Sequence, residues 1–545
     1  MSYSEFDAPW DENPREFAEN ALRDEHGTRL YENDLGHLLS TIIRYNDIPR
    51  LKQYLSVYSP RLDLEQKVFD DPLCVVASQG RTEVLRVLID YYNTNWKHLP
   101  LYQRGCSLLT AACGEAQIET ARLIMDSQPA LNSAHINQVY RDEALLATAR
   151  SLGSLPPCGR GIETPEGCYH WVSNRTAQAE ELICLLLDGG ASAQAAEPLE
   201  DSSQPKHCYG TVLGRASSRA GPALVKRLIE QGANVHAREE YQPDITSRLC
   251  GNRGDPSGVT ALHISSAYWN SEVLQTLLDH SGITASEELL CRDSYGLLPL
   301  HWAAAGPGSW ECWLPDEKIN KRTLDTLKLL CSGSDINARD NKGMTPLHHA
   351  VCGHARCGQS IHADNIVKFL LEKGAHAGLA DDNSQTVLHK MAYYCLEGDP
   401  INTSLMQMLL SHGADINQQD INGNTALHLM ARNLRQTKVT QFLISQGADV
   451  SLLNVKGNTA LHECLTMGTI LTRETSNGPV APTVADRRKA LDEMINILSH
   501  VGGDAMMEQT NQAGETPRQL QSTKLAYWQQ LELRKATRNK LSSKS

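Results

Sequence analysis

Short apolar stripes at helical spacing recur in pairs along the chain. In TALHLMA, Leu427 and Met430 lie three residues apart and share one face of a helix. A second stripe in TKVTQFLIS consists of four apolar residues, Val439, Phe442, Leu443 and Ile444. Neither predicted helix is long enough to be stable alone in water, so both stripes must be buried against neighbouring pairs. The pattern therefore predicts an all-α array of stacked helix pairs, which needs at least three pairs for stability.

The helix pairs return with a fixed period. Thr425 in NGNTALHLMA and Thr459 in KGNTALHECL are 34 residues apart, and so are Gly413 in HGADIN and Gly447 in QGADVS. A period near 33 residues with these sequence motifs resembles the ankyrin repeat, which has a T-P-L-H opening and a G-A-D turn. The resemblance implies an all-α ankyrin-repeat solenoid of stacked helix–turn–helix units with long inserted loops.

Six openings keep the Leu-His pair, and most also keep the threonine. The histidines are His263, His301, His348, His389, His428 and His462. The threonines are Thr260, Thr345, Thr386, Thr425 and Thr459, while Leu298 stands in the remaining opening. A threonine hydroxyl suits a helix N-cap. One histidine per unit cannot converge on one metal ion, so we expect each to bond within its own turn.

Glycines end the second helix of several units. They are Gly232, Gly374, Gly413 and Gly447. A left-handed helix stop explains this choice, because a Cβ costs about 1–2 kcal/mol in that conformation.

The first part of the chain keeps the frame without the Leu-His pair. Residues 38–55, 71–89 and 106–125 read as helix pairs, and ALLATA from Ala144 with ELICLLLDGGA from Glu181 reads as one interrupted pair. We count eleven to twelve units over residues 35–530. Four segments are predicted: 1–34, an acidic tail or cap; 35–200, degenerate repeats with an insertion near 151–176; 205–530, repeats with Leu-His openings and a C-terminal cap; and 531–545, a basic tail.

Insertions interrupt the period and are expected to project from the surface, where specificity usually resides. They lie near 151–176, 194–208, 238–257, 306–322, 353–362, 396–402 and 468–485. Trp310 and Trp313 lie in one of them and Trp302 lies beside it. Two interpretations fit these tryptophans equally: anchors of a partner interface, or packing of the loop onto its own array.

The net charge limits the kinds of partner that the chain can bind, and the cysteine content indicates the cellular compartment. The formal net charge of −13 makes direct DNA or RNA binding unfavourable. No run of 18 apolar residues predicts a membrane span, and the acidic N-terminus is not a secretory signal. Fifteen scattered cysteines without a CxxC pair indicate a reducing compartment, nucleus or cytoplasm, and a protein that is not secreted.

The sequence contains few motifs that would indicate metal binding or catalysis. Cys158, Cys168, His170, His207 and Cys208 could supply zinc ligands, but their spacing matches no familiar zinc pattern, and incidental thiols explain them better. Cys352 and Cys357 bracket another loop, for which a metal or redox role is a weaker hypothesis. No Walker A loop, nucleophile elbow or H-E-x-x-H motif occurs. We therefore expect no enzymatic activity, metal or cofactor.

The two tails differ in charge. Residues 1–34 hold ten acidic and three basic side chains, with Phe6, Trp10 and Phe17 interleaved. This mixture resembles the disordered segments of transcriptional activators, and an acidic cap over the first unit is the alternative. The C-terminus carries Arg534, Lys535, Arg538, Lys540 and Lys544, which fit either a weak nuclear-import patch or a solvated helix end.

These features predict a non-enzymatic interaction scaffold that binds other proteins through the face made by turn tips and first helices. The chain resembles long fungal-type ankyrin-repeat regulators. That likeness, with the two tails, favours a transcription coregulator acting through a partner factor, without direct contact to nucleic acid or membrane. The alternative is a cytoplasmic adaptor, such as a substrate receptor or an enzyme inhibitor.

Overall fold

A computed structural model describes most of the chain. The described residues are 42–43, 45–58, 72–95, 101–126, 134–153, 165–197, 210–240, 256–280, 289–306, 315–357, 361–394, 401–469, 473–475, 478–480 and 482–542. The described residues fall into two compact parts: those within 1–154 and 171–196 make an N-terminal part, and those within 155–170 and 197–545 make a C-terminal part. Within the described ranges, no helix combines the length and apolarity needed to cross a membrane.

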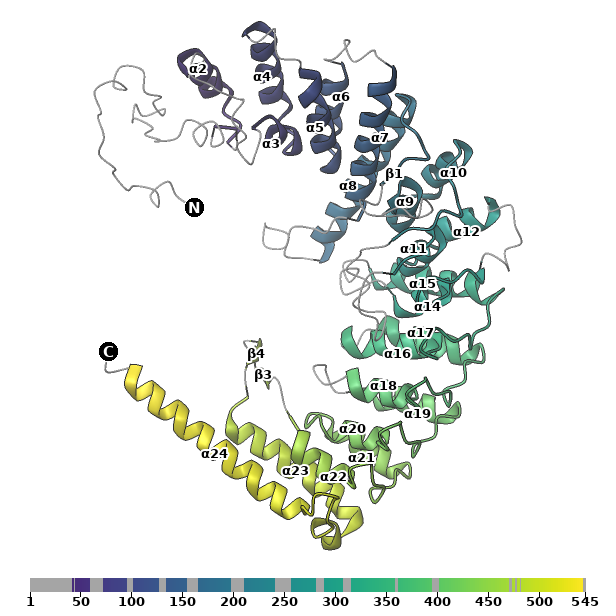
Figure 1. The fold of residues 1–545 in the computed structure, drawn as a ribbon, viewed down its shortest axis with the longest axis vertical. Helices are drawn as coiled ribbons and strands as arrows, with labels where there is room; N and C mark the ends of the chain where they lie inside the picture. Colours follow the sequence, from purple (N-terminus) through teal and green to yellow (C-terminus); the bar gives the residue numbers. More distant parts are fainter. Residues whose placement is uncertain are drawn as a thin grey trace. The chain divides into compact units, whose positions relative to one another are not determined.

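The N-terminal part is a stack of helix pairs (Figure 1). Its helices are α2 (Ile48–Tyr58), α3 (Pro72–Ser78), α4 (Thr82–Asn95), α5 (Leu101–Gly114), α6 (Ile118–Asp126), α7 (Ala134–Ser151) and, from residue 171 onwards, α8 (Pro165–Asp188). Helices α3, α5 and α7 contact one another in sequence, as do α2, α4 and α6. Apolar stripes meet between the rows, where Leu51, Leu85 and Leu108 are buried.

The C-terminal part has two rows of helices. The first helices of its units are α9 (Val212–Arg219), α11 (Ala261–Ala267), α14 (Pro299–Ala305), α16 (Pro346–Cys357), α18 (Val387–Tyr394), α20 (Ala426–Met430) and α22 (Ala460–Met467). The second helices are α10 (Pro222–Glu230), α12 (Ser271–His280), α15 (Asp316–Cys331), α17 (Ile361–Glu372), α19 (Thr403–Ser411), α21 (Thr437–Ser445) and α23 (Val484–Gly502). Each helix contacts its counterparts in the adjoining units, so both rows are continuous.

A long helix closes the C-terminal stack. The 3₁₀ turn η5 (Asp504–Met507) leads to α24 (Pro517–Ser542), which packs on α22. Lys524 of α24 donates from Nζ to the carbonyl oxygen of Leu465 at 2.8 Å, near the end of α22, where helix carbonyls lack intrahelical partners. The chain predicted as a separate basic tail, 531–545, continues this helix as far as Ser542.

Strands are few and short in the described residues. β1 (Ala196–Glu197) pairs with β2 (Gly210–Thr211), just before α9. β3 (Arg473–Thr475) and β4 (Gly478–Val480) form an antiparallel hairpin between α22 and α23, with Glu474 opposite Pro479.

Several expected insertions are regular structure. Residues 165–176 form the first turns of α8, and 316–322 form the first turns of α15. Within 353–362, α16 ends at Cys357 and α17 begins at Ile361. These segments lengthen the helices of a unit, so a break in the repeat period did not by itself distinguish a loop from extra helical turns.

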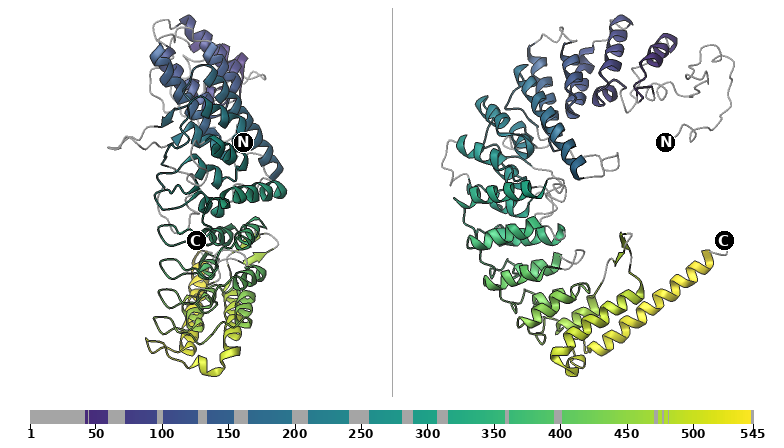
Figure 2. Two further views of the ribbon diagram at one scale, coloured as in Figure 1. Left: turned by 90° about the vertical axis from the view of Figure 1, so that its right-hand side faces the viewer. Right: turned by 180° about the vertical axis from the view of Figure 1, so that it is seen from behind.

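The turns before the first helices form a ladder in the C-terminal part, visible as a row along one edge in Figure 2. Backbone hydrogen bonds join each turn to the next. Asp382 N donates to Lys342 O, Ile421 N to Asn383 O, and Val455 N to Asn422 O, at 2.9–3.0 Å. Because each turn is held by the one before it, the exposed tips stand in a fixed register.

Candidate interaction surface

The opening histidines connect neighbouring units. His389 Nδ1 lies 3.2 Å from the backbone nitrogen of Thr386 and 2.9 Å from its hydroxyl, while Nε2 lies 2.9 Å from the carbonyl oxygen of Asn424 in the next unit. Since a carbonyl only accepts, Nε2 carries the proton. The same bond to the next unit runs from His263 to Leu297, His301 to Ala338, His348 to Gln385 and His428 to Asn458, at 3.0–3.2 Å.

Burial keeps these imidazoles neutral. Desolvation lowers the pKa of His263 and of His348 to about 4, and that of His301 to about 3. Burial also lowers the pKa values of His389, His428 and His462. In His263, His301, His348, His389 and His428, a neutral ring with both nitrogens engaged is suited to holding two units together and has no free lone pair for a metal. In His462, Nε2 is buried without a hydrogen-bond partner.

The glycines at the ends of the second helices have left-handed backbones. Their φ angles are +94° at Gly232, +94° at Gly374, +89° at Gly413 and +97° at Gly447. In this region a Cβ is strained even where space is open, as it is around Gly447.

A row of Asp and Asn residues in the turns was not predicted from the sequence. Asp340 Oδ1 accepts from the backbone nitrogens of Lys342 and Met344, both at 2.8 Å, and so closes the turn. The same position is held by Asp293, Asp381, Asp420, Asn454 and Asn511. A recurring Asp or Asn three residues before a Gly in most turns (DSYG, DNKG, DING, NVKG, NQAG) was the signal that could have revealed it.

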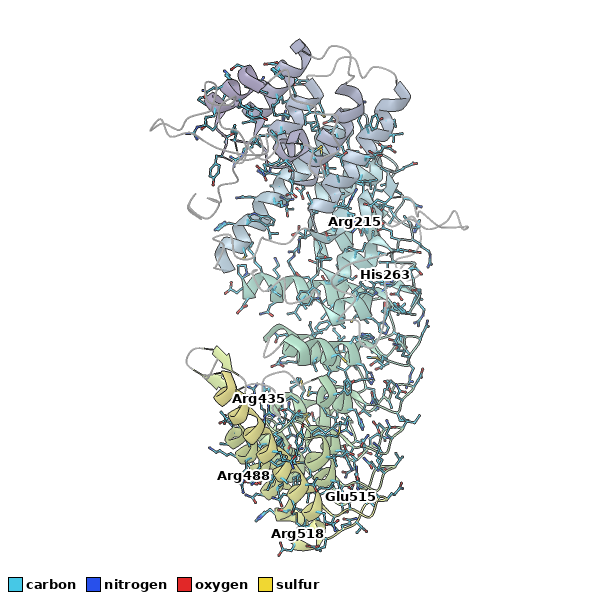
Figure 3. All side chains as sticks on the ribbon, turned by 60° about the vertical axis from the view of Figure 1, so that its left-hand side comes forward. Arg215, His263, Arg435, Arg488, Glu515 and Arg518 are labelled. Carbon is cyan, nitrogen blue, oxygen red and sulfur yellow. The ribbon has the colours of Figure 1, made fainter. Side chains whose placement is uncertain are left out.

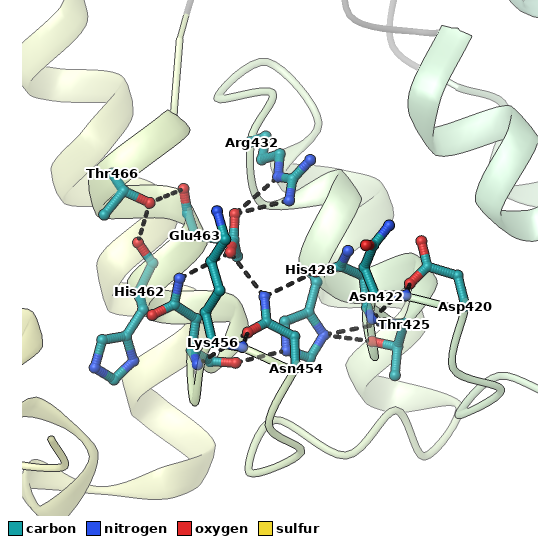
Figure 4. A network of polar contacts seen from close by, with 12 residues as sticks. Asp420, Asn422, Thr425, His428, Arg432, Asn454, Lys456, His462, Glu463 and Thr466 are labelled. Atoms are coloured by element: carbon teal, nitrogen blue, oxygen red, sulfur yellow. Dashed lines mark hydrogen bonds and ion pairs between the residues drawn. The ribbon is translucent and has the colours of Figure 1, made fainter. Parts of the chain in front are cut away.

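At Asp293, Asp340 and Asp381 the second carboxylate oxygen is bound by the residue that follows the opening histidine, whereas Asp420 Oδ2 accepts from the Gln385 amide at 3.4 Å. Asp340 Oδ2 lies 3.0 Å from His349 Nε2, and Asp381 Oδ2 lies 2.6 Å from Lys390 Nζ. In the Asn454 turn the roles are reversed, since Glu463 accepts from the Asn454 amide at 2.8 Å and also binds Arg432 (Figure 4). These buried carboxylates of the core are thus paired across turn and helix.

The hypothesis that Trp302 lies at a partner interface is wrong. Its side chain is 0% exposed, and its Nε1 donates to Asp293 Oδ2 at 3.0 Å. A buried tryptophan bonded to a turn aspartate belongs to the core and cannot anchor a partner. Trp310 and Trp313, the other two residues of that hypothesis, lie outside the described residues.

The zinc hypothesis falls largely outside the described residues, because Cys158, His207 and Cys208 are not among them. Cys168 and His170 lie on the first turns of α8. In the part of the chain that the structure describes, no group of three or more His, Cys, Asp or Glu side chains could hold a metal ion. The side chain of Cys357, which pairs with Cys352 in the second thiol hypothesis, is also outside that part.

Three exposed apolar side chains stand out on the turn ladder. Ile421 and Val455 occupy equivalent tip positions of consecutive turns and are 64% and 56% exposed. Leu453, two residues before Val455, is 43% exposed, and its carbonyl oxygen accepts from the Gln419 amide at 2.9 Å. We call Ile421, Leu453 and Val455 the tip surface. Elsewhere the equivalent tips are polar, as at Asn341 and Asp382.

Comparison with known proteins identifies the repeats. A family model of ankyrin repeats in three copies matches residues 318–398, 355–451 and 394–472. The putative ankyrin repeat protein FPV230 of Fowlpox virus (strain NVSL) is 26% identical over 192 residues, which cover 32% of this chain and 87% of that protein. Neurogenic locus notch homolog protein 1 of Homo sapiens is 25% identical over 204 residues, 33% of this chain. The match spans only 7% of the length of that notch protein.

A solved structure is also similar: the ankyrin repeat domain of Bcl-3, a unique member of the IkappaB protein family. It has a TM-score of 0.31 and 21% identity, and the likeness covers 55% of this chain and 99% of that domain. The predicted fold class, an all-α ankyrin-repeat solenoid, is confirmed by the helix pairs together with the family match. Ankyrin repeats are a non-enzymatic module for binding other proteins. The opening histidines, the glycine stops and the family model agree, and the chain is an ankyrin-repeat protein.

Proposed function

We propose that this chain is a regulatory scaffold that binds a protein partner over the tip surface and acts as a transcription coregulator. The observation that carries the binding site is the exposure of Ile421, Leu453 and Val455 on turns whose backbones are hydrogen-bonded to each other. Exposed apolar groups on a rigid support lose little conformational entropy on binding, so their burial by a partner is favourable.

The coregulator role is supported by the tails and the charge. The acidic and aromatic composition of residues 1–34 suits contact with the transcription machinery, and the basic C-terminus suits nuclear import. The net charge of −13 disfavours direct binding to DNA. The partner would therefore be a DNA-binding factor, and the site of action the nucleus.

The test is proximity labelling in cells with simultaneous localisation, using the wild-type chain and the double variant Ile421→Ser, Val455→Ser. We expect a nuclear signal and a DNA-binding factor among the labelled proteins, lost at least tenfold in the double variant. Val501→Ser is the matched control, because Val501 is equally exposed, at 57%, but lies at the end of α23. Circular dichroism must show the same helical content in all three proteins.

The outcomes separate the two parts of the proposal. Exclusion from the nucleus would overturn the coregulator role and favour a cytoplasmic adaptor, such as a substrate receptor or enzyme inhibitor. Equal labelling of the same partners by the wild type and the double variant would overturn the tip surface as the binding site.

A further inference from the structure

One unit of the C-terminal part lacks its opening histidine. Thr211 caps α9, and its hydroxyl accepts from the backbone nitrogen of Gly214 at 2.9 Å. In the units that open at Thr260, Thr345, Thr386 and Thr425, the residue three positions after the capping threonine is a histidine, which binds both the threonine and the next unit. At α9 this residue is Gly214, so the imidazole that would join α9 to the following unit is missing.

A carboxyl group from the next unit takes its place. Glu239 lies in the turn region that leads to α11, where its backbone forms two hydrogen bonds with Val259, at 2.8 and 3.1 Å. Its side chain is 1% exposed, and Oε1 accepts from the Thr211 hydroxyl at 2.5 Å. A Cβ on Gly214 would overlap the carboxylate oxygens of Glu239, so the absence of a side chain there makes room for it.

The surroundings of Glu239 offer only partial charge compensation. From α9 comes Arg215, whose guanidinium lies 3.8 Å from Glu197 of β1 and is therefore shared between two acids. The other charged residue of α9 is Arg219, whose guanidinium lies over the ring of Tyr268. The titratable residue of α11 is His263, a neutral imidazole (Figure 3). Glu239 Oε2 is buried without a hydrogen-bond partner.

We propose that Glu239 makes the junction between α9 and α11 a pH-sensitive hinge, closed while the carboxyl is protonated and loosened when it ionises. An ionised carboxylate is poorly tolerated in a buried site with an unmatched oxygen. Moving it to water requires release of Thr211, which caps the preceding unit, and strains the Glu239–Val259 backbone pair of the turn before α11.

The titration range supports this role. Burial raises the pKa of Glu239 to about 7, against the opposing effects of the Thr211 hydrogen bonds and the charge of Arg215. The open form ionises near the ordinary glutamate pKa, about 4.3. Between these values the closed form holds a proton that the open form has lost. The junction therefore weakens as pH rises towards 7 and changes little above it. The histidine junctions respond in the opposite direction, because their pKa values are lowered.

The experiment is hydrogen exchange of the full chain, followed by mass spectrometry from pH 5.5 to 8 and corrected for intrinsic exchange rates. We expect the protection factor of α9 and α11 to fall by up to about tenfold per pH unit until pH 7. The protection of α20 and α22 should rise to about pH 6.5 and then stay level. A fall that is absent, or shared by α20 and α22, overturns the proposal.

Variants locate the effect at one carboxyl group. Glu239→Gln keeps an oxygen that can accept from Thr211 but cannot ionise, and should abolish the fall. Glu240→Gln removes the adjacent, half-buried carboxylate and should leave the fall unchanged. Arg215→Gln removes a charge that lowers the pKa of Glu239, so the level region should begin at higher pH. A persistent fall in Glu239→Gln would contradict the assignment. If that variant does not fold, the shift in Arg215→Gln decides.

Discussion

The Lys390 ammonium nitrogen lies 2.6 Å from Asp381 Oδ2, and both side chains are almost wholly buried. The other oxygen of Asp381 closes the turn by accepting from the backbone nitrogens of Asn383 and Gln385. The pair therefore ties a first helix to the turn that precedes it, and it occupies the position that His349 and Asp340 hold in the unit before.

Removing one partner of this pair should be strongly destabilising. We expect Lys390→Met to lower the free energy of unfolding by about 3–5 kcal/mol, because Asp381 is left as an uncompensated buried charge. Lys328→Met is the control: Lys328 and Asp325 are 3.2 Å apart but exposed, and the loss there should stay below about 1 kcal/mol. Urea denaturation measures both. Adding Asp381→Asn to Lys390→Met should recover part of the loss, since Asn454 fills the same position naturally.

Two glycines separate backbone strain from close packing. Gly447 has φ +97° and open space around a Cβ, so Gly447→Ala should cost only the strain of about 1–2 kcal/mol. Gly423 has φ +72°, and a Cβ there would lie 2.9 Å from Asn454 Cα in the next turn. We therefore expect Gly423→Ala to be the more destabilising by thermal melting. Equal losses of stability would mean that the backbone of the next turn shifts readily to accommodate the added Cβ.

Core packing of the repeat is tested at Leu427, which is buried on α20. Leu427→Ala should lower stability by about 2–5 kcal/mol, because a cavity remains between two units. Chemical denaturation measures the loss, with Leu453→Ala on the exposed tip as the control. An unchanged midpoint for Leu427→Ala would contradict the packing of α20.

Acid should destabilise the array through its histidines. Burial holds the pKa values of His263 and His348 at about 4, below the value of about 6.5 expected in the unfolded chain. The unfolded chain therefore binds more protons between these values, and stability is lost as pH falls from about 6.5 towards 4. Each histidine should contribute up to about 1.4 kcal/mol per pH unit. Denaturation of His348→Gln should show a shallower pH dependence than the wild type.

Trp302 should behave as a core residue. Trp302→Phe removes the donor to Asp293 Oδ2 and should cost about 1–3 kcal/mol, with no selective loss of partner binding once folding is restored by low temperature. The interface hypothesis stays a prediction for the other two tryptophans. Trp310→Ala combined with Trp313→Ala decides between the two interpretations: reduced partner labelling at an unchanged melting temperature supports the interface, and a lowered melting temperature supports packing of the loop onto its own array.

The repeat itself could be read from the chain. Leu-His openings, glycine stops and paired apolar stripes require no knowledge of distant contacts, because each is set by the local geometry of a helix cap, a left-handed stop or a helix face. The histidine's bond to its own threonine is equally local. Its bond to the next unit depends on stacking, which brings a carbonyl about 35 residues away within reach, as from His389 to Asn424.

Tertiary structure decided the rest. Trp302 and Trp310 look alike in the sequence, but only Trp302 follows an opening histidine, where the turn aspartate collects a donor. The sequence has Gly214 at the position where other units have the opening histidine, and only the structure shows that Glu239 from the next unit fills that place. Ile421 and Val455 are exposed because of their positions at the tips of the turn ladder, although both residues are apolar. In a stacked array each side chain faces a neighbouring unit, so its burial and charge depend on residues that its own repeat does not contain.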